Sequence, residues 1–253
     1  MLILLPPSEG KSAPESGSAT RELSFAELDK QRAHVWRALI AMCKADPHIA
    51  AKNLGLGVTQ LDEVNSNAHL AKSFCGPAIG VYTGVLYEAL DAQSLNARTR
   101  IKLHKSVAIS SALFGLVRPL DLIPAYRLSG NSTVTGLPSL AQVWRDAAAK
   151  VIEDSTGPII DMRSQTYVAL GPVPHSCDER AITLRVLHEK NGKRSVVSHF
   201  NKATKGELVR SLMLQAKTPK NINEFLTVLS EIGYQWELNE PKKGPALLDL
   251  ITH

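Results

Sequence analysis

The distribution of hydrophobic and polar positions along the chain predicts short buried strands separated by helices. Four apolar runs bounded by polar or turn-forming residues are typical of buried strands, and they cover residues 2–5, 78–82, 106–110 and 157–161. Between them, apolar residues recur every three or four positions, which indicates amphipathic helices. Strands that alternate with helices predict an α/β fold with a mixed, mostly parallel central sheet and flanking helices.

Side-chain caps predict where several helices begin. A Ser or Thr three residues before Glu or Gln forms a capping box, and the pairs are Ser24 with Glu27, Ser139 with Gln142, and Thr204 with Glu207. These pairs predict helices over residues 24–44 and 139–153 and a third that begins at residue 204. Asn221 predicts the start of a further helix that Gly233 ends.

The C-terminal third changes to the two-residue period of β-strands. Alternating residues 181–186, the turn Asn191-Gly192 and the returning run 196–200 predict a β-hairpin. Residues 234–238 and 246–251 predict a second hairpin. Because neither internal repeats nor a long linker are visible, we expect residues 1–253 to form a single domain.

Composition places the chain among ordinary globular proteins with a sizeable core, at 44% hydrophobic and 21% charged residues. There is no apolar run of about 18 residues, so no membrane span is expected. The apolar start, residues 2–5, lacks a preceding basic segment, which favours a strand over a signal peptide and predicts a cytoplasmic protein.

Cysteine and histidine spacing predicts no metal site and no cofactor. The three cysteines are widely separated, and no zinc-like, ferritin-like or facial-triad-like spacing is visible. Cys43 lies on an apolar helix face and is expected in the core. Cys177, beside Pro174 and His175, is the best candidate for an exposed thiol.

Charge is mildly basic, which is compatible with nucleic acid or small anions. The formal net charge is +5, and residues 189–210 contain six Lys and Arg against two Glu. Lys202 and Lys205 are expected at a strand-to-helix junction, where they form either an anion site or an ordinary surface turn.

Residues 110–128 combine apolar positions with unusually many polar side chains. A buried strand is followed by four such residues, interspersed with two prolines: Arg118, Asp121, Tyr126 and Arg127. This pattern favours a functional cleft, but an Arg–Asp pair that pins a crossover explains it as well. Asp161, at the end of another buried strand, is either an active-site carboxylate or a helix cap.

The segment after the first strand places Lys11 where open α/β sheets bind ligands. Gly10-Lys11-Ser12 imitates the end of a phosphate-binding loop, but Leu5 occupies the position that requires the first glycine of that motif. The phosphate-binding-loop interpretation therefore fails. Lys11 remains a polar side chain at a strand end.

A glycine turn near residues 48–72 predicts an element like a helix-hairpin-helix. Gly55 and Gly57 flank one apolar residue between a short helix and a longer one. In such elements the glycines let the backbone approach a DNA phosphate, and Lys52 is the natural phosphate partner here. A tight turn between helices with a glycine cap accounts for the same residues without DNA.

Five sequence blocks resemble the peroxide stress protein YaaA family. They are PSEGK (residues 7–11), YTGVLY (82–87), LFGLVRPLDLIPAYRL (113–128), DMRSQTY (161–167) and SHFNKATKGELVR (198–210). The resemblance implies a bacterial cytosolic protein that protects against hydrogen peroxide in connection with intracellular iron. It also implies one α/β fold with a helix-hairpin-helix element that binds double-stranded or distorted DNA.

By position, the family blocks supply eight residues here: Lys11, Arg118, Asp121, Tyr126, Arg127, Asp161, Lys202 and Lys205. Where many relatives read K-x-A-R-G, this chain has Thr204-Lys205-Gly206, so the charge is kept but the planar guanidinium is lost. The segment around Gly55 and Gly57 also differs from the better-studied relatives.

Two functional hypotheses follow. In the first, the protein binds double-stranded or distorted DNA through Gly55, Gly57, Lys52 and the other basic residues, with energy that comes from phosphate contacts. In the second, it is an uncharacterised enzyme that acts on a nucleotide, a nucleobase or damaged nucleic acid. Asp121 or Asp161 is then the general base, and Tyr126 is a further catalytic candidate. Direct iron handling lacks a matching ligand pattern.

Overall fold

A mostly parallel β-sheet forms the centre of the protein. The computed structural model describes residues 1–196, 198–239, 241 and 243–252. Within them the sheet has eight strands in the order β4-β3-β1-β6-β7-β10-β9, with β8 paired to β7. Their bounds are β1 (Leu2–Leu5), β3 (Val107–Ser111), β4 (Gly115–Val117), β6 (Ile159–Asp161), β7 (Ala181–Lys190), β8 (Lys193–Ser195), β9 (Gln235–Asn239) and β10 (Ala246–Thr252).

The five inner strands run parallel, and the antiparallel strands lie outside them. β3, β1, β6, β7 and β10 pair in parallel, with Leu4 between Ala108 and Asp161 in the register. β4, β8 and β9 pair antiparallel to β3, β7 and β10. The buried runs of β1 and β3 explain this arrangement, because a parallel strand is covered on both faces. The predicted α/β fold with a mixed, mostly parallel sheet is confirmed.

The order of the strands creates a switch point between β1 and β6. From β1 the chain continues to β3 on one side, and from β6 it continues to β7 on the other. The segments that leave the carboxyl ends of these two neighbouring strands therefore diverge. In open α/β sheets, ligands bind in the crevice that such a divergence opens.

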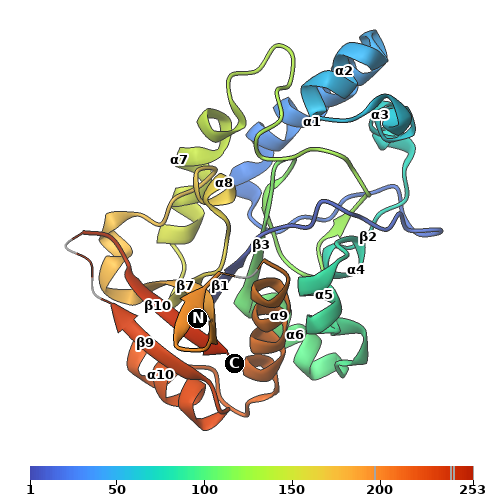
Figure 1. The fold of residues 1–253 in the computed structure, drawn as a ribbon. Helices are drawn as coiled ribbons and strands as arrows, with labels where there is room; N and C mark the ends of the chain where they lie inside the picture. The colour runs from blue at the N-terminus through green and yellow to red at the C-terminus, as the bar shows by residue number, and fades with distance from the viewer. Residues whose placement is uncertain (197, 240, 242, 253) are drawn as a thin grey trace.

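Helices cover the sheet in two groups that Figure 1 shows on either side of it. One group contains α5 (Val85–Leu90), α6 (Ala97–Ser106) and α9 (Ser198–Leu214), and α9 packs along α5 and against β7. The other contains α7 (Leu140–Glu153), whose Trp144 contacts Gly115 of β4, beside Leu28. Gly115 adopts a φ of 73°, and a Cβ there would collide with the Trp144 ring.

The remaining elements complete a single hydrophobic core. They include α1 (Asp29–Ala45), α2 (Pro47–Leu54), α3 (Leu61–Ala68), α4 (Ala78–Val81), α8 (Gln165–Val168), α10 (Ile222–Glu231) and the small pair β2 (Gly76–Pro77) with β5 (Leu122–Ile123). Buried residues from both ends of the chain belong to one cluster. None of the described helices combines the length and the apolar character needed to cross a membrane.

Several predicted elements are confirmed. The capping box of Ser139 and Gln142 opens α7, and the Asn221 side chain accepts the Glu224 N–H at the start of α10. Asn191 and Gly192, with φ of 52° and 71°, form the turn between β7 and β8. The second hairpin is present as antiparallel β9 and β10.

Two expectations in the first half are wrong. Residues 78–82 begin as the short helix α4 rather than a strand, because a short apolar run without clear periodicity fits a buried helix equally well. The helix expected from residue 24 begins instead at residue 29, after a 3-10 turn (Ala26–Leu28). Ser24 does not cap it, since its side chain bonds to Asp121.

Two expectations in the second half are also wrong. The strand expected over residues 196–200 and the helix start at Thr204 are replaced by α9, which already runs from residue 198; position 197 lies outside the described residues. Thr204 is buried within this helix. Cys177 is buried at 1% exposure rather than exposed, and Cys43 is in the core as expected.

Candidate functional site

Lys11 is held at the carboxyl end of β1 by main-chain pairing. Ser12 N donates to Val81 O at 2.9 Å, and Thr83 N donates to Gly10 O at 3.3 Å. Lys11 thereby faces Tyr82 across an antiparallel bridge. This pairing fixes where the Lys11 side chain leaves the backbone.

The amino group of Lys11 lies against two tyrosine rings. Nζ is 4.4 Å from the ring centre of Tyr126 and 5.5 Å from that of Tyr82. It donates to the carbonyl oxygens of Ser8 at 3.0 Å and Glu9 at 3.3 Å. Burial, and then the nearby Arg127 cation, lower the pKa of Lys11 from 10.5 to about 7.

A buried chain of hydroxyl groups supports these rings. The Tyr126 hydroxyl lies 2.9 Å from that of Tyr82 and 2.7 Å from Ser111 Oγ, at the carboxyl end of β3. Ser111 Oγ also accepts the Phe114 N–H at 2.9 Å. Burial raises the pKa of the Tyr126 hydroxyl well above its usual value, so the chain is uncharged at neutral pH.

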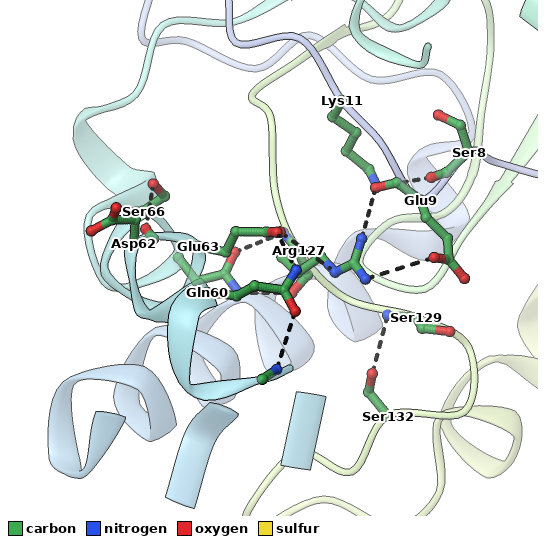
Figure 2. Close-up of polar contacts among 12 residues, drawn as sticks. Ser8, Glu9, Lys11, Gln60, Asp62, Glu63, Ser66, Arg127, Ser129 and Ser132 are labelled. Carbon is green, nitrogen blue, oxygen red and sulfur yellow. Dashed lines mark hydrogen bonds and ion pairs between the residues drawn. The ribbon is translucent and has the colours of Figure 1, made fainter. Parts of the chain in front are cut away.

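Arg127 occupies the outer side of the same site. Its main chain is clamped by Asn67, which donates to Arg127 O at 2.7 Å and accepts Arg127 N–H at 2.9 Å. Figure 2 shows the guanidinium between Glu63 and Glu9, at 3.5 Å and 3.7 Å from their carboxylates. Both distances exceed those of tight charged hydrogen bonds. Glu9 is also 82% exposed, so an incoming anion can displace it.

Lys11 and Arg127 converge on one acceptor. Arg127 Nη1 donates to the Glu9 carbonyl oxygen at 3.2 Å, the same atom that accepts from Lys11 Nζ. Two basic side chains therefore meet at a single neutral oxygen, as Figure 2 shows. We refer to Lys11, Arg127, Tyr82 and Tyr126 as the lysine site.

The glycine turn between α2 and α3 adjoins the lysine site. Gly55 has a φ of 70° and ends α2, and Gly57 N donates to Gln60 Oε1 at 3.1 Å. Gln60 Nε2 in turn donates to Glu63 Oε1 at 3.0 Å, and Glu63 pairs with Arg127. A continuous polar path thus connects the turn to the lysine site (Figure 2). Lys52, on α2, is exposed.

Arg118 and Asp121 form a separate cluster near the amino end of β3, away from the carboxyl ends of the parallel strands. Arg118 Nη1 donates to the carbonyl oxygens of His104 and Lys105 at 3.0 and 2.8 Å. These residues end α6 immediately before β3 begins, whereas Tyr126 approaches the carboxyl end of β3. Asp121 accepts from Ser24 N, Ser24 Oγ and Arg118 N at 3.0, 2.6 and 2.8 Å.

Asp161 and Lys205 lie at the carboxyl end of β6. Both carboxylate oxygens of Asp161 accept from the buried Arg163 guanidinium, at 2.9 and 2.7 Å. Lys205 Nζ donates to Met162 O at 2.9 Å, and burial lowers its pKa to about 8. Lys202 is exposed on α9. Sequence reasoning missed Arg163 as the Asp161 partner, although its position two residues after the strand-end acid was visible.

The predicted residues are therefore brought together only in part. Lys11, Tyr126 and Arg127 share one site. Among the described residues, no hydrogen bond or ion pair joins them to Arg118 and Asp121 or to Asp161 and Lys205. Within the same described part of the chain, no three His, Cys, Asp or Glu side chains gather as metal ligands would.

Comparison with known proteins gives consistent matches over the full chain. A family model described as peroxide stress protein YaaA matches residues 1–240. A UPF0246 protein of Streptomyces coelicolor is 40% identical over 259 residues, which cover 100% of this chain and 99% of that protein. A UPF0246 protein of Corynebacterium glutamicum is 39% identical over 250 residues, which cover 96% and 97% of the two chains.

Proposed function

The chain belongs to the peroxide stress protein YaaA family, and on that premise we propose that it serves the peroxide response by binding double-stranded or distorted DNA. The proposed contact surface runs from the turn between α2 and α3 to the lysine site. Gly55, Gly57 and Lys52 contact the phosphate backbone at one end. Lys11 and Arg127 receive a phosphate at the other.

The observation that carries this proposal is the polar path from the glycine turn to Arg127. Gly57, Gln60, Glu63 and Arg127 follow one another through contacts of 3.1, 3.0 and 3.5 Å. The Glu63 side chain is 40% exposed and that of Arg127 is 22% exposed, so this end of the path is accessible from solvent. A Cβ placed on Gly55 would meet no atom within 4 Å, so the space before the turn is open to a phosphate.

The net charge of the chain favours an anionic partner. The chain carries a formal net charge of +5, and the carboxylates that accompany Arg127 are held loosely, at 3.5 and 3.7 Å. A phosphate can replace Glu9 and gain a bidentate contact with the guanidinium. Phosphate contacts at Lys52 and Arg127 give an expected slope of log affinity against log salt of about −2, and Lys11 adds to this slope only in its protonated form.

Fluorescence anisotropy with labelled duplex, bulged and nicked DNA over a range of salt concentrations tests this proposal. Lys52→Ala and Arg127→Ala are each expected to weaken binding about threefold to tenfold and to reduce the salt slope by about one. Lys105→Ala is the matched control, because this exposed lysine lies at the end of α6 by the opposite edge of the sheet. Absent or salt-independent binding, or an equal effect of Lys105→Ala, contradicts the proposal.

A second candidate function is an enzyme that acts on a nucleotide, a nucleobase or damaged nucleic acid. It is favoured by one observation, the amine of Lys11 with its pKa lowered to about 7 beside the switch point of the sheet. Asp121 and Asp161 are less suited to act as general bases, since both oxygens of each already accept hydrogen bonds. Thermal stabilisation by nucleoside monophosphates without any duplex binding favours this candidate over the first.

A further inference from the structure

We propose that the amine of Lys11 is a nucleophile that forms an imine with an aldehyde carried next to a phosphate ester, as in the ring-opened deoxyribose of an abasic site in DNA. This inference rests on the proposed binding of DNA at the lysine site. It adds a covalent step and a class of substrate to that site.

The hydrogen bonds of Lys11 leave its lone pair available. A neutral primary amine has two N–H groups and one lone pair. The two carbonyl oxygens that accept from Nζ, those of Ser8 and Glu9, account for both N–H groups. No carboxylate among the described residues forms an ion pair with Nζ that would hold a third proton on it. The lone pair is thus free to attack a carbonyl carbon.

The surroundings of Nζ favour the neutral amine. The ring faces of Tyr126 and Tyr82 replace water on one side, and Arg127 donates to the same Glu9 oxygen on another. Both effects lower the pKa of Lys11, to about 7, so the nucleophilic neutral amine is populated near neutral pH. A solvated lysine would be almost fully protonated there.

The position of Arg127 selects the substrate class. Its guanidinium meets Lys11 at the Glu9 carbonyl, and the exposed Glu9 carboxylate beside it can be displaced. A phosphate bound to Arg127 therefore places an aldehyde a few bonds away beside Nζ. An abasic nucleotide has this arrangement, because its C1′ aldehyde is joined through C2′ to C3′, the carbon that carries the 3′ phosphate. A small aldehyde phosphate shares the same chemistry.

The reaction is balanced by loss of one water. The nitrogen lone pair attacks the aldehyde carbon, a C–N bond forms, and the carbonyl electron pair moves to oxygen, which gains a proton while nitrogen loses one. The nitrogen lone pair then expels the hydroxyl group, which takes up one proton from solvent and leaves as water. The product is a protonated imine between Lys11 and C1′. No oxidant or reductant takes part in this step.

Borohydride trapping tests the inference on the full chain. The protein is mixed with a labelled duplex that contains an abasic site, and borohydride reduces any imine to a stable amine that survives denaturing gels. A duplex with a tetrahydrofuran analogue, which lacks the aldehyde, is the substrate control. Free deoxyribose 5-phosphate forms a third arm that represents small aldehyde phosphates.

The expected result is a covalent adduct with the abasic duplex and none with the tetrahydrofuran duplex. Lys11→Arg keeps the charge but loses the nucleophile, so its adduct should fall at least about tenfold. Lys105→Arg is the matched control and should trap as wild type does, because this exposed lysine lies at the end of α6. Tryptic mapping of the wild-type adduct locates the bond without any variant, because a modified Lys11 is not cleaved and yields the peptide of residues 1–21.

Each other outcome has one meaning. An adduct mapped to a different lysine, or an undiminished adduct in Lys11→Arg, overturns the inference. Binding of both duplexes without an adduct also overturns it and leaves the proposed function standing. An adduct with deoxyribose 5-phosphate alone supports the imine and assigns the aldehyde to a small molecule. If neither duplex binds and nothing is trapped, the proposed function and the inference fail together.

Discussion

Lys11 and Arg127 donate to the same carbonyl oxygen, that of Glu9, at 3.3 and 3.2 Å. The two residues come from segments far apart in the chain, and their charges repel one another across this shared acceptor. Of the two kinds of side chain, the lysine amine is the one whose pKa shifts readily on burial. Lys11 is therefore the residue whose protonation changes: burial and then the Arg127 cation lower its pKa to about 7.

This relationship predicts a pH dependence of stability. Lys11 has a pKa of about 7 in the folded state and 10.5 as its ordinary value, so between these values the unfolded chain binds more protons. The free energy of unfolding must then rise with pH, by up to about 1.4 kcal/mol per pH unit. Lys11→Met should remove this rise, as denaturant unfolding from about pH 6.5 to 9.5 would measure.

The groups that face Lys11 support this assignment. The charged ones are Arg127, Glu9 and Glu63, and burial raises the hydroxyl pKa values of the two tyrosines, which stay protonated over this range. Lys205, with a pKa of about 8, contributes equally to the pH dependence of stability in wild type and in Lys11→Met, so its effect cancels when the two are compared. If the free energy of unfolding has the same dependence on pH in wild type and in Lys11→Met, Lys11 is solvated and its pKa is not lowered.

The hydroxyl chain beneath Lys11 predicts coupling between Tyr126 and Ser111. Tyr126→Phe keeps the ring 4.4 Å from Nζ but removes hydrogen bonds of 2.9 and 2.7 Å to Tyr82 and Ser111. Loss of a buried partner should reduce the free energy of unfolding by about 1–2 kcal/mol. Combined with Ser111→Ala in a double-mutant cycle, the change should fall short of additivity by about 1 kcal/mol. Full additivity would show that the two hydroxyls do not interact.

Within residues 110–128, the sequence predicts the strand and the polar residues but not where those polar side chains lie. The apolar run of β3 and the polar residues after it are visible in the sequence. Nothing local shows that Arg118 turns toward the carbonyl oxygens at the end of α6 while Tyr126 reaches the opposite end of β3. Each destination is set by partners distant in sequence. The sequence of this segment therefore suggests a single cleft wall, whereas in the structure its polar residues lie at opposite ends of β3.

The same distinction explains which elements could be predicted. The start of α7 depends on Ser139 and Gln142, three residues apart, so its capping box is readable. The position of α9 depends on the contact of Gly206 with α5, more than a hundred residues earlier. A strong local pattern, Thr204 with Glu207, pointed to the wrong start because tertiary packing decided the helix instead. The convergence of Lys11 and Arg127 is non-local for the same reason.

The division of the segment predicts that Asp121 is needed for stability and not for ligand binding. In Asp121→Asn one oxygen becomes an NH2 group that cannot accept, so either the Ser24 hydroxyl or the two N–H groups of Ser24 and Arg118 lose their acceptor, and the negative charge is lost as well. We expect a loss of about 2–3 kcal/mol in the free energy of unfolding, with unchanged DNA affinity below the melting temperature. The exposed Asp146→Asn serves as the charge-matched control. A loss of affinity without a loss of stability would place Asp121 in the binding surface.

The crossing of α9 and α5 predicts a severe effect of one methyl group. A Cβ on Gly206 would overlap Leu86 O and lie 2.9 Å from both Ala89 Cβ and Leu90 N. These atoms belong to the main chain or to a Cβ and cannot rotate away, so α9 must move. Gly206→Ala should therefore lower the free energy of unfolding by about 3 kcal/mol, measured as a lower denaturant midpoint with an unchanged slope.

Gly80→Ala is the matched control for this substitution. Gly80 lies in α4, and a Cβ there would meet no atom within 4 Å. Alanine restricts the unfolded chain more than glycine, so this change should stabilise the protein by about 0.5–1 kcal/mol. Because α9 carries Lys205, its displacement in Gly206→Ala should also loosen the contact with Met162 O. Equal stability of the two variants would mean that α9 and α5 do not pack at this glycine.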